Sequence, residues 1–148
     1  ITGIGQKTTS AGFTKNTSLT SMESTVIAGQ SALKMSNHNI SEIDVAEVHD
    51  AFSVCEPMVL ESLGFTNPGE GINMSQKLHE ENNFMINPRG GLIGSGHPLG
   101  ATGISQTIEI VQQLQKTAGS RQTNNPKTGL IHNMSAAATS STVLVLEK

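Results

Sequence analysis

Residues 90–103 read GGLIGSGHPLGATG and lead into a helical pattern over residues 101–116. Six of these fourteen residues are glycine, so the backbone of the stretch is open to close approach by a ligand. The helical pattern that follows places apolar residues on one face, at Ile104, Ile108, Val111 and Leu114. The stretch therefore predicts a glycine-rich loop at residues 90–100 that runs into an amphipathic helix.

His97 is placed in this loop at the mouth of a helix that we expect to begin near Leu99. Pro98 suits the first helical position, where its missing N–H needs no partner. The positive end of the helix dipole disfavours imidazolium, so a neutral His97 is expected to act as a base or oxyanion donor. The alternative is a tight packing loop in which His97 binds a backbone carbonyl. A nucleotide-binding loop is disfavoured, because the Gly-Lys-Ser/Thr and G-x-G-x-x-G patterns are absent.

Strands and helices alternate along the chain on both sides of this loop. We expect strands at residues 1–8, 44–48, 85–87, 129–132 and 142–147, and helices at residues 21–35, 51–63 and 101–116. Residues 65–84 are polar and are predicted to form an excursion with one helical turn at residues 75–79. This order predicts one domain with a layered α/β sheet, mostly parallel, that ends in an antiparallel pair.

Two of the expected helices have details that can be tested. Val26 and Leu33, with small neighbours, are predicted to form the inner face of the helix at residues 21–35. Gly64 is expected to cap the helix at residues 51–63. Pro57 marks either a kink in that helix or its first turn.

Composition excludes several classes of function. The net charge is −3 and the nine basic residues are scattered, which argues against nucleic acid and against binding to a membrane surface. The single cysteine, Cys55, excludes an internal disulfide, and no apolar run reaches the length of a membrane span. We expect a cytoplasmic protein. Because the chain opens on a strand at Ile1, it is also expected to come from something longer.

A second constellation, His49-Asp50-Ala51-Phe52, follows the strand expected at residues 44–48. The carboxyl ends of strands are where open α/β sheets bind ligands, so His49 is well placed for catalysis. The alternative is that Asp50 is the N-cap of the next helix and His49 a buried histidine at a strand end.

Several ordered blocks together resemble the thiolase superfamily. They read Glu47-Val48-His49-Asp50-Ala51-Phe52, Leu63-Gly64-Phe65, Ile86-Asn87-Pro88-Arg89-Gly90-Gly91 and Gly96-His97-Pro98-Leu99-Gly100-Ala101-Thr102-Gly103, with a similar opening strand at Ile1-Thr2-Gly3-Ile4-Gly5-Gln6. More narrowly, the blocks resemble the C-terminal half of the archaeal and sterol-carrier-protein thiolases, the lipid-transfer-protein-like branch. The blocks cover nearly the whole chain, 1–148, and are more specific together than any single motif.

The resemblance implies roles for particular residues. His97 corresponds to the histidine that activates the nucleophilic cysteine and helps to form an oxyanion hole, and His49 to a second oxyanion-hole residue. Such donors can contribute on the order of 3 kcal/mol each to catalysis. His132 is a weaker catalytic candidate, whose alternative is a histidine at a strand end. The remaining expected contacts with substrate are Gly96, Pro98, Phe52 and Asn133.

The chain departs from the family pattern in its cysteines. The nucleophilic cysteine of thiolases belongs to the N-terminal half, and Cys55 is expected to be a buried thiol on a helix. A second family cysteine is missing at both of its usual places, which are Ala51 here and the loop after His132-Asn133. Neither His38 nor His79 forms a metal-binding pattern, so no metal site is indicated.

The resemblance also implies a fold and partners. The expected fold is one half of the thiolase fold, a five-stranded mixed sheet covered by helices in the order βαβαβαββ, with the helix at residues 101–116 at its centre. The expected partner is a thiolase N-terminal half, in the same parent chain or a separate subunit, within a homodimer or tetramer. A small zinc-binding OB-fold protein is a further possible partner. No cofactor is expected beyond coenzyme A thioester as substrate.

Three functions remain open from the sequence. The first is an acyl-CoA acyltransferase of the thiolase type, inactive as this chain by itself. The second keeps the fold but acts as a retro-aldolase on a β-hydroxyacyl-CoA. The third is a non-catalytic scaffold or lipid-binding subunit.

Overall fold

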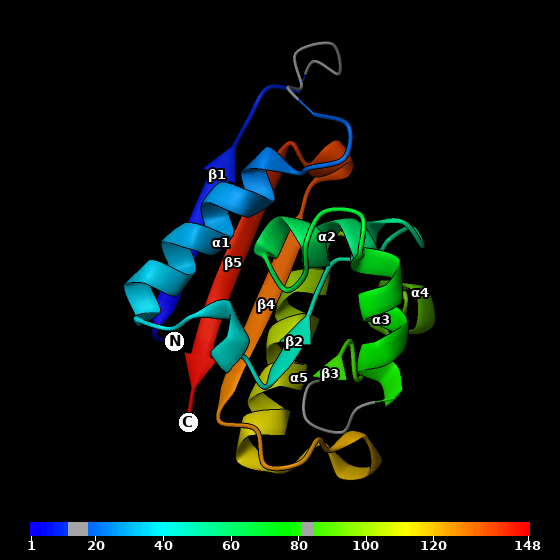
Figure 1. Cartoon of the computed structure of the whole chain (residues 1–148). Coiled ribbons are helices and arrows are strands. Elements are labelled where there is room, and N and C mark those ends of the chain that lie inside the picture. Colours follow the sequence, from blue (N-terminus) through cyan, green and yellow to red (C-terminus); the bar gives the residue numbers. More distant parts are fainter. Residues whose placement is uncertain (12–17, 81–84) are drawn as a thin grey trace.

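A computed structural model describes residues 1–11, 18–80 and 85–148, and a mixed sheet lies at its centre (Figure 1). The strands run in the order β1-β5-β4-β2-β3. Their bounds are β1 Gly3–Thr8, β2 Val45–Glu47, β3 Met85–Ile86, β4 Thr128–Met134 and β5 Ser140–Glu147. β3 adds two residues at one edge, so the other four strands carry most of the sheet. The predicted α/β class is confirmed.

Two of the neighbouring strand pairs in this sheet are parallel and two are antiparallel. β2 is parallel to both β3 and β4, whereas β5 is antiparallel to both β4 and β1. The antiparallel pair at the end of the chain was predicted correctly. The prediction of a mostly parallel sheet was wrong, because the first strand joins the edge of β5 and not the parallel group.

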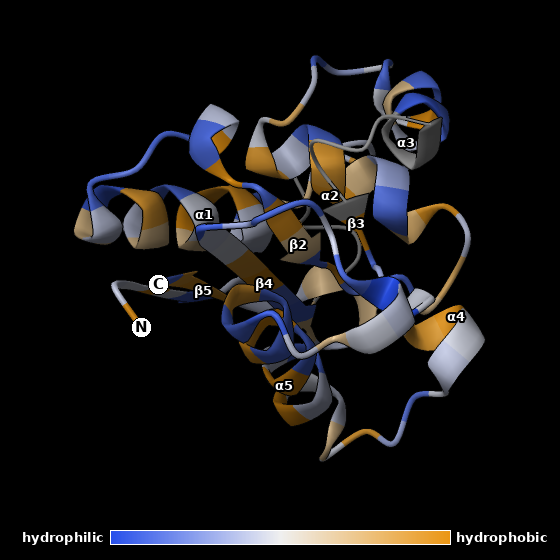
Figure 2. Ribbon diagram, turned by 90° about the horizontal axis from the view of Figure 1, so that it is seen from below, coloured by the Kyte–Doolittle hydropathy of each residue, from blue (hydrophilic) through white to orange (hydrophobic). Residues whose placement is uncertain are grey.

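The helices form layers on both faces of the sheet (Figures 1 and 2). α1 Glu23–Ser36 packs on β1 and β5, and α2 Cys55–Leu63 lies beside it on the same side. α5 Thr102–Gln115 covers β4 and β2 from the opposite side. The remaining helical elements are α3 Gly71–Glu80, α4 Gly91–Ser95, and the short 3-10 turns η2 Ile40–Glu42, η3 Gly119–Arg121 and η4 Ala136–Ala138. Across the described ranges, none of the helices is long and apolar enough to cross a membrane.

Three local predictions need correction. The helix expected at residues 51–63 begins at Cys55, which places Pro57 in its first turn, where no N–H is needed. The glycine-rich loop contains the five-residue helix α4. The polar excursion holds α3, ten residues long and not one turn, because polarity and glycines masked its helical pattern. Residues 81–84 of that excursion lie outside the described residues. Gly64 caps α2 in the left-handed conformation, as predicted.

Small residues bring α1 close to the sheet. A Cβ on Gly5 would lie 1.9 Å from the carbonyl oxygen of Ala28, and one on Gly3 would lie 2.2 Å from that of Ala32. The buried face of α1 therefore consists of small residues, whereas the predicted inner residues Val26 and Leu33 are half-buried. Because of this close packing, neither Gly3 nor Gly5 of β1 can be replaced by a residue with a side chain unless α1 moves.

The burial of α5 also differs from its apolar pattern. Ile104 and Ile108 are exposed, while Gln106, Glu109 and Gln113 are among the residues that face the sheet. Gln106 donates from Nε2 to the carbonyl of His132 over 3.2 Å, so its burial is compensated by hydrogen bonding. The sheet side of α5 is thus partly polar, and its solvent side carries an apolar stripe.

Candidate active site

His49 lies just beyond the carboxyl end of β2, where the chain leaves the sheet. The strand end is held by Asn87, whose Oδ1 accepts a hydrogen bond from the backbone N–H of Val48 over 2.8 Å. Asn87 in turn donates from Nδ2 to Glu56 over 2.9 Å. His49 is 5% exposed, so its ring is held among protein atoms and not in solvent.

His97 approaches His49 from the segment between α4 and α5. The two ring centroids are 4.9 Å apart and the rings are perpendicular. His97 itself is exposed, so one ring of the pair is open to solvent and the other is buried. Two histidines that are 48 positions apart in the sequence are therefore brought into contact by the fold.

Hydrogen bonding determines which nitrogen of His97 is free. Thr102 directs its hydroxyl proton to the carbonyl of Pro98 over 3.2 Å, and Nδ1 of His97 lies 2.7 Å from the same hydroxyl oxygen. Since a hydroxyl has one proton, Nδ1 of His97 must be the donor in the second bond. Nε2 of His97 consequently keeps a lone pair. α5 begins at Thr102, one residue from the start of the helix predicted at residues 101–116. Leu99 and Pro98 precede it in a turn in which the backbone N–H groups of Ala101 and Thr102 donate to the carbonyl of Pro98.

Asp50 joins the two segments that carry the histidines. Its Oδ1 accepts a hydrogen bond from the backbone N–H of Leu92 over 2.6 Å, in the first turn of α4. The carboxylate sits so close to Gly91 that a Cβ there would lie 2.0 Å from Oδ2. Asp50 therefore does not cap the helix that follows it in sequence, as the alternative supposed, but reaches α4 from a distance of 42 positions.

Burial determines the protonation of His49. It lowers the pKa of His49, as does the neighbouring His97, while Asp50 opposes the shift. Nδ1 of His49 is buried and has no hydrogen-bond partner among the described residues. The expected form of His49 is neutral, which suits a ring that donates a hydrogen bond to a developing oxyanion.

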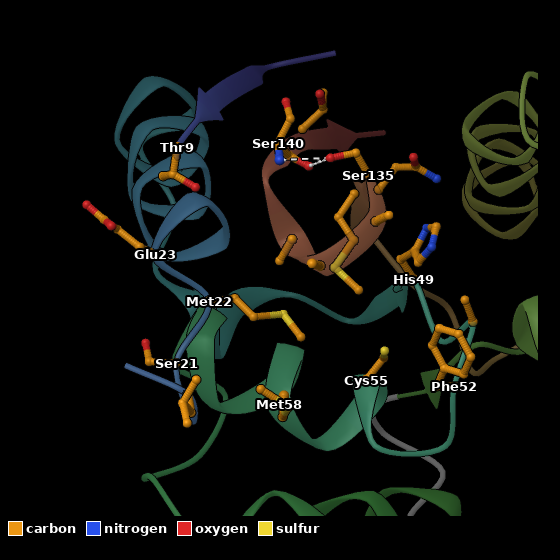
Figure 3. A pocket seen from close by; sticks show the side chains of 18 of the residues that line it. Thr9, Ser21, Met22, Glu23, His49, Phe52, Cys55, Met58, Ser135 and Ser140 are labelled. Atoms are coloured by element: carbon orange, nitrogen blue, oxygen red, sulfur yellow. Dashed lines mark hydrogen bonds between the residues drawn. The ribbon is translucent and has the colours of Figure 1, made fainter. Parts of the chain in front are cut away.

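A cavity of about 1140 Å³ opens beside the two histidines (Figure 3). Its walls come from α2, the segment before α1, and the loop between β4 and β5. In Figure 3 Cys55 and Met58 rise from α2, with Met22 on one side and Phe52 near His49 on the other. The wall is mostly apolar, so the cavity suits an apolar group whose reacting end lies at the histidines.

The predicted site residues fall into three places. Phe52 and Asn133 line the cavity with His49 and His97. Gly96 and Pro98 lie exposed in the segment that carries His97 and are not among the residues that line the cavity. His132 is fully buried behind the cavity, where burial lowers its pKa to about 3.

Cys55 was expected to be a buried thiol, and it is 7% exposed. The structure adds that Cys55 also lines the cavity. Its position six residues after His49 indicated a helix but could not indicate which side of that helix meets a ligand.

Sequence reasoning missed a buried ion pair beneath the site. Glu47 is fully buried, with Oε2 3.6 Å from Nη2 of Arg89. The backbone N–H of Arg89 donates to Oε1 of the same carboxylate over 3.4 Å. Burial raises the pKa of Glu47 to about 7, against the opposing effect of Arg89. Both residues belong to the blocks that resemble the family, but nothing in the sequence paired them.

The other histidines lie away from this site. His38 lies 3.5 Å from a carboxylate oxygen of Glu147 and 4.0 Å from one of Glu42. The side chain of His79 lies outside the described residues. Within the described part of the chain, no group of three His, Cys, Asp or Glu residues is placed to hold a metal ion.

Comparison with protein families assigns the chain to a class. The family model described as "Thiolase C-terminal domain-like" matches residues 5–148. The chain belongs to this thiolase family, and the resemblance inferred from its sequence is confirmed.

Individual relatives carry different names. The chain is 37% identical over 132 residues to an acetyl-CoA acetyltransferase of Methanothermobacter thermautotrophicus, covering 88% of this chain and 34% of that protein. It is 43% identical over 96 residues to sterol carrier protein 2 of Homo sapiens, covering 64% and 18%. The chain thus spans about a third or less of the length of these relatives.

A solved structure titled "Ltp2-ChsH2(DUF35) aldolase" has a similar fold. It superposes with a TM-score of 0.82 over 98% of this chain and 38% of that chain, at 21% sequence identity. At this identity the likeness shows the fold alone, which is thiolase-like.

Proposed function

We propose that the chain is the C-terminal half of an acyl-CoA acyltransferase of the thiolase type. In this proposal a cysteine from an N-terminal half, in the same parent chain or a separate subunit, takes the acyl group. His97 and His49 supply the base and the oxyanion-hole contacts. The substrate is a coenzyme A thioester, and the reaction needs no further cofactor.

The single observation that carries the proposal is the perpendicular His49–His97 pair, 4.9 Å apart, beside an apolar cavity. The free Nε2 of His97 can accept the thiol proton of an incoming cysteine, because its Nδ1 proton is committed to Thr102. His49, kept neutral by burial, can donate to the oxygen on which negative charge develops.

A retro-aldolase is the second candidate. Ala51 lines the cavity where sterol-carrier-protein thiolases have a cysteine, and the loop after His132-Asn133 carries alanines and not a thiol. Loss of that acid/base thiol favours cleavage of a β-hydroxyacyl-CoA, in which no second thiol is needed. The solved structure titled an aldolase agrees with this candidate in its title. At 21% sequence identity, however, it supports the fold alone.

The proposed partner is the N-terminal half, which would cover the exposed stripe of α5. A second cavity, about 610 Å³, runs along this stripe and is lined by Ile104, Ile108 and Val111. Exposed apolar surfaces of this kind mark interaction sites. We also keep the homo-oligomer and the zinc-binding OB-fold partner as proposals, together with the non-catalytic scaffold as a third function.

The test uses this chain joined to, or co-produced with, a thiolase N-terminal half that bears the cysteine. Acetoacetyl-CoA with CoA is compared with a β-hydroxyacyl-CoA as substrate. His97→Ala is expected to lower turnover by roughly a hundredfold or more, as for an oxyanion-hole donor or base. His38→Ala, a histidine remote from the site, serves as the control and should leave turnover unchanged. Absence of turnover on both substrates would overturn both catalytic functions in favour of the scaffold.

A further inference from the structure

A chain of buried hydroxyl groups leads from His132 through the layer between α1 and the sheet. Nε2 of His132 lies 3.0 Å from Oγ1 of Thr25, which lies 2.9 Å from Oγ of Ser141. Ser141 lies 2.7 Å from Oγ of Ser24, and Ser24 donates to the carbonyl of Ala138 over 2.6 Å. His132 and the three hydroxyl residues are fully buried, so these bonds are satisfied inside the protein.

The carbonyl of Ala138, at the end of this series of hydroxyl groups, determines the direction of every hydrogen bond in the series. A carbonyl can only accept, so the one proton of Ser24 is committed to Ala138. Ser24 must then accept from Ser141, and Ser141 must accept from Thr25. Thr25 has no proton left for His132, so Nε2 of His132 must be the donor.

We propose that Thr25, Ser141 and Ser24 form a relay that selects the Nε2–H tautomer of His132, and that His132 is a positioning residue of the active site. Within this proposal Nδ1 of His132 keeps its lone pair. That atom is buried and has no hydrogen-bond partner among the described residues, as is also true of Nδ1 of His49. Besides burial, the neighbouring His49 lowers the pKa of His132.

The relay links His132 to the wall of the cavity. Ala138, where it ends, lines the cavity together with Ala137, and both have left-handed backbone conformations, with φ of 52° and 55°. His132 does not line the cavity, so it can influence substrate only through other residues, among them those of this loop and His49. The catalytic role that the sequence suggested for His132 is thereby replaced by a role behind the site, which rests on the proposed function for its effect on turnover.

The tautomer can be measured without any substrate. In the 148-residue chain labelled with ¹⁵N-histidine, the two ring nitrogens of His132 give separate resonances for protonated and unprotonated nitrogen. The expected result is a protonated Nε2 and an unprotonated Nδ1, with His132→Asn used to identify the signals. A protonated Nδ1 would overturn the proposal.

Variants at Ser141 and Thr25 separate the relay from general packing. Ser141→Ala removes the stronger of the two acceptors of Thr25. The other is the weakly accepting Sδ of Met22 at 3.9 Å, so Thr25 can donate to Nε2 of His132 and the tautomer should invert to Nδ1–H. Thr25→Val should shift both nitrogens toward intermediate values, and Thr25→Ser should restore the parent pattern. Ser31→Ala, at a hydroxyl that bonds the carbonyl of Ile27 within α1, is the matched control and should change nothing. An unchanged tautomer in Ser141→Ala would refute the relay.

The positioning role is measured in the enzyme assembled with its nucleophile-bearing half. Ser141→Ala is expected to lower kcat several-fold with KM unchanged, because His132 touches no substrate. Equal kcat in Ser141→Ala and Ser31→Ala would remove His132 from the active site. If the assembled parent shows no turnover, the proposed function fails, whereas the tautomer measurement still decides the relay.

Discussion

At the scale of single residues, one carboxylate connects the two histidine-bearing segments. Asp50 accepts from the backbone N–H of Leu92 across the short gap to α4. This contact ties the segment that carries His49 to α4, which immediately precedes the segment that carries His97.

Asp50→Ala is expected to lower the free energy of unfolding by about 1–3 kcal/mol, because it leaves the buried N–H of Leu92 without an acceptor. Asp50→Asn keeps an acceptor oxygen and should lose less than half as much. Urea unfolding of the three proteins measures the difference, and turnover should fall in the same order. Equal stability of Asp50→Ala and the parent would contradict the connection.

The raised pKa of Glu47 predicts that the stability of the protein depends on pH. Its pKa is raised from 4.5 to about 7 by burial, so the folded state holds a proton that the unfolded state has released between these values. The folded state binds more protons there, and Glu47 therefore costs stability as pH rises through that window. The total cost is on the order of 3 kcal/mol, because a tenfold change in a proton-binding constant corresponds to about 1.4 kcal/mol.

Glu47→Gln removes this titration. The free energy of unfolding of the variant minus that of the parent should rise between pH 4.5 and about 7, and stay level above and below. Urea unfolding at a series of pH values measures it. His132, whose pKa is lowered to about 3, acts with the opposite sign in both proteins and cancels in the difference. A flat difference across the window would disprove the raised pKa.

These residue-scale features differ in how far the sequence predicted them. His49 and His97 could be found because they stand in ordered blocks that resemble a family. The partners Leu92, Arg89 and Thr25 could not, because each contact joins segments at least 42 positions apart. Neither the periodicity of apolar residues nor the spacing of motifs in the sequence predicts such a contact.

At the scale of elements, the loop between β4 and β5 is under backbone strain. Ala137 and Ala138 are both left-handed, a conformation that costs a residue with a Cβ about 1–2 kcal/mol. The loop is nevertheless held by Ser135, which accepts from the backbone N–H of Ser140 over 2.9 Å, as the dashed line in Figure 3 shows. The hydrogen bonds of the loop therefore offset its strain.

Ala137→Gly is expected to raise the free energy of unfolding by roughly 0.5–1 kcal/mol, the relief of strain less the extra freedom of glycine in the unfolded chain. Ala136→Gly is the matched control, because Ala136 has no positive φ and should lose stability instead. Thermal unfolding of both variants makes the comparison. Destabilisation of equal size at the two positions would show that the strain is absent.

α5 shows the limit of pattern reading at this scale. Its apolar stripe was found from spacing, but the sheet side turned out to hold Gln106, Glu109 and Gln113. Glu109 is paired with Arg121 at 2.9 Å, which offsets its burial. Periodicity identifies the stripe but does not tell whether the domain itself or a partner covers it.

At the scale of the whole molecule, that stripe is a surface that the domain leaves open. Ile104 is 65% exposed and lies beside the second cavity. In the proposed enzyme the N-terminal half covers this face, while α1 and α2 remain on the far side of the sheet (Figure 2).

Ile104→Asp should therefore abolish co-purification with a thiolase N-terminal half and leave the stability of this chain within about 0.5 kcal/mol, as for other surface substitutions. Met35→Asp, at an equally exposed apolar residue of α1 on the opposite face, should leave co-purification intact. Pull-down from co-expressing cells together with urea unfolding measures both effects. Retained binding by Ile104→Asp would place the partner elsewhere.

The sequence by itself determined the α/β class, the thiolase family and the approximate place of the main strands and helices, and it singled out His49 and His97 as candidates for the site. Those features are local patterns or ordered blocks, which a linear chain displays directly. Only the tertiary structure decided the strand order, the Asp50 connection, the Glu47–Arg89 pair and the hydrogen-bond contacts behind the proposed relay to His132. Each of these depends on which distant groups the fold brings together inside the protein, where most buried polar groups are paired.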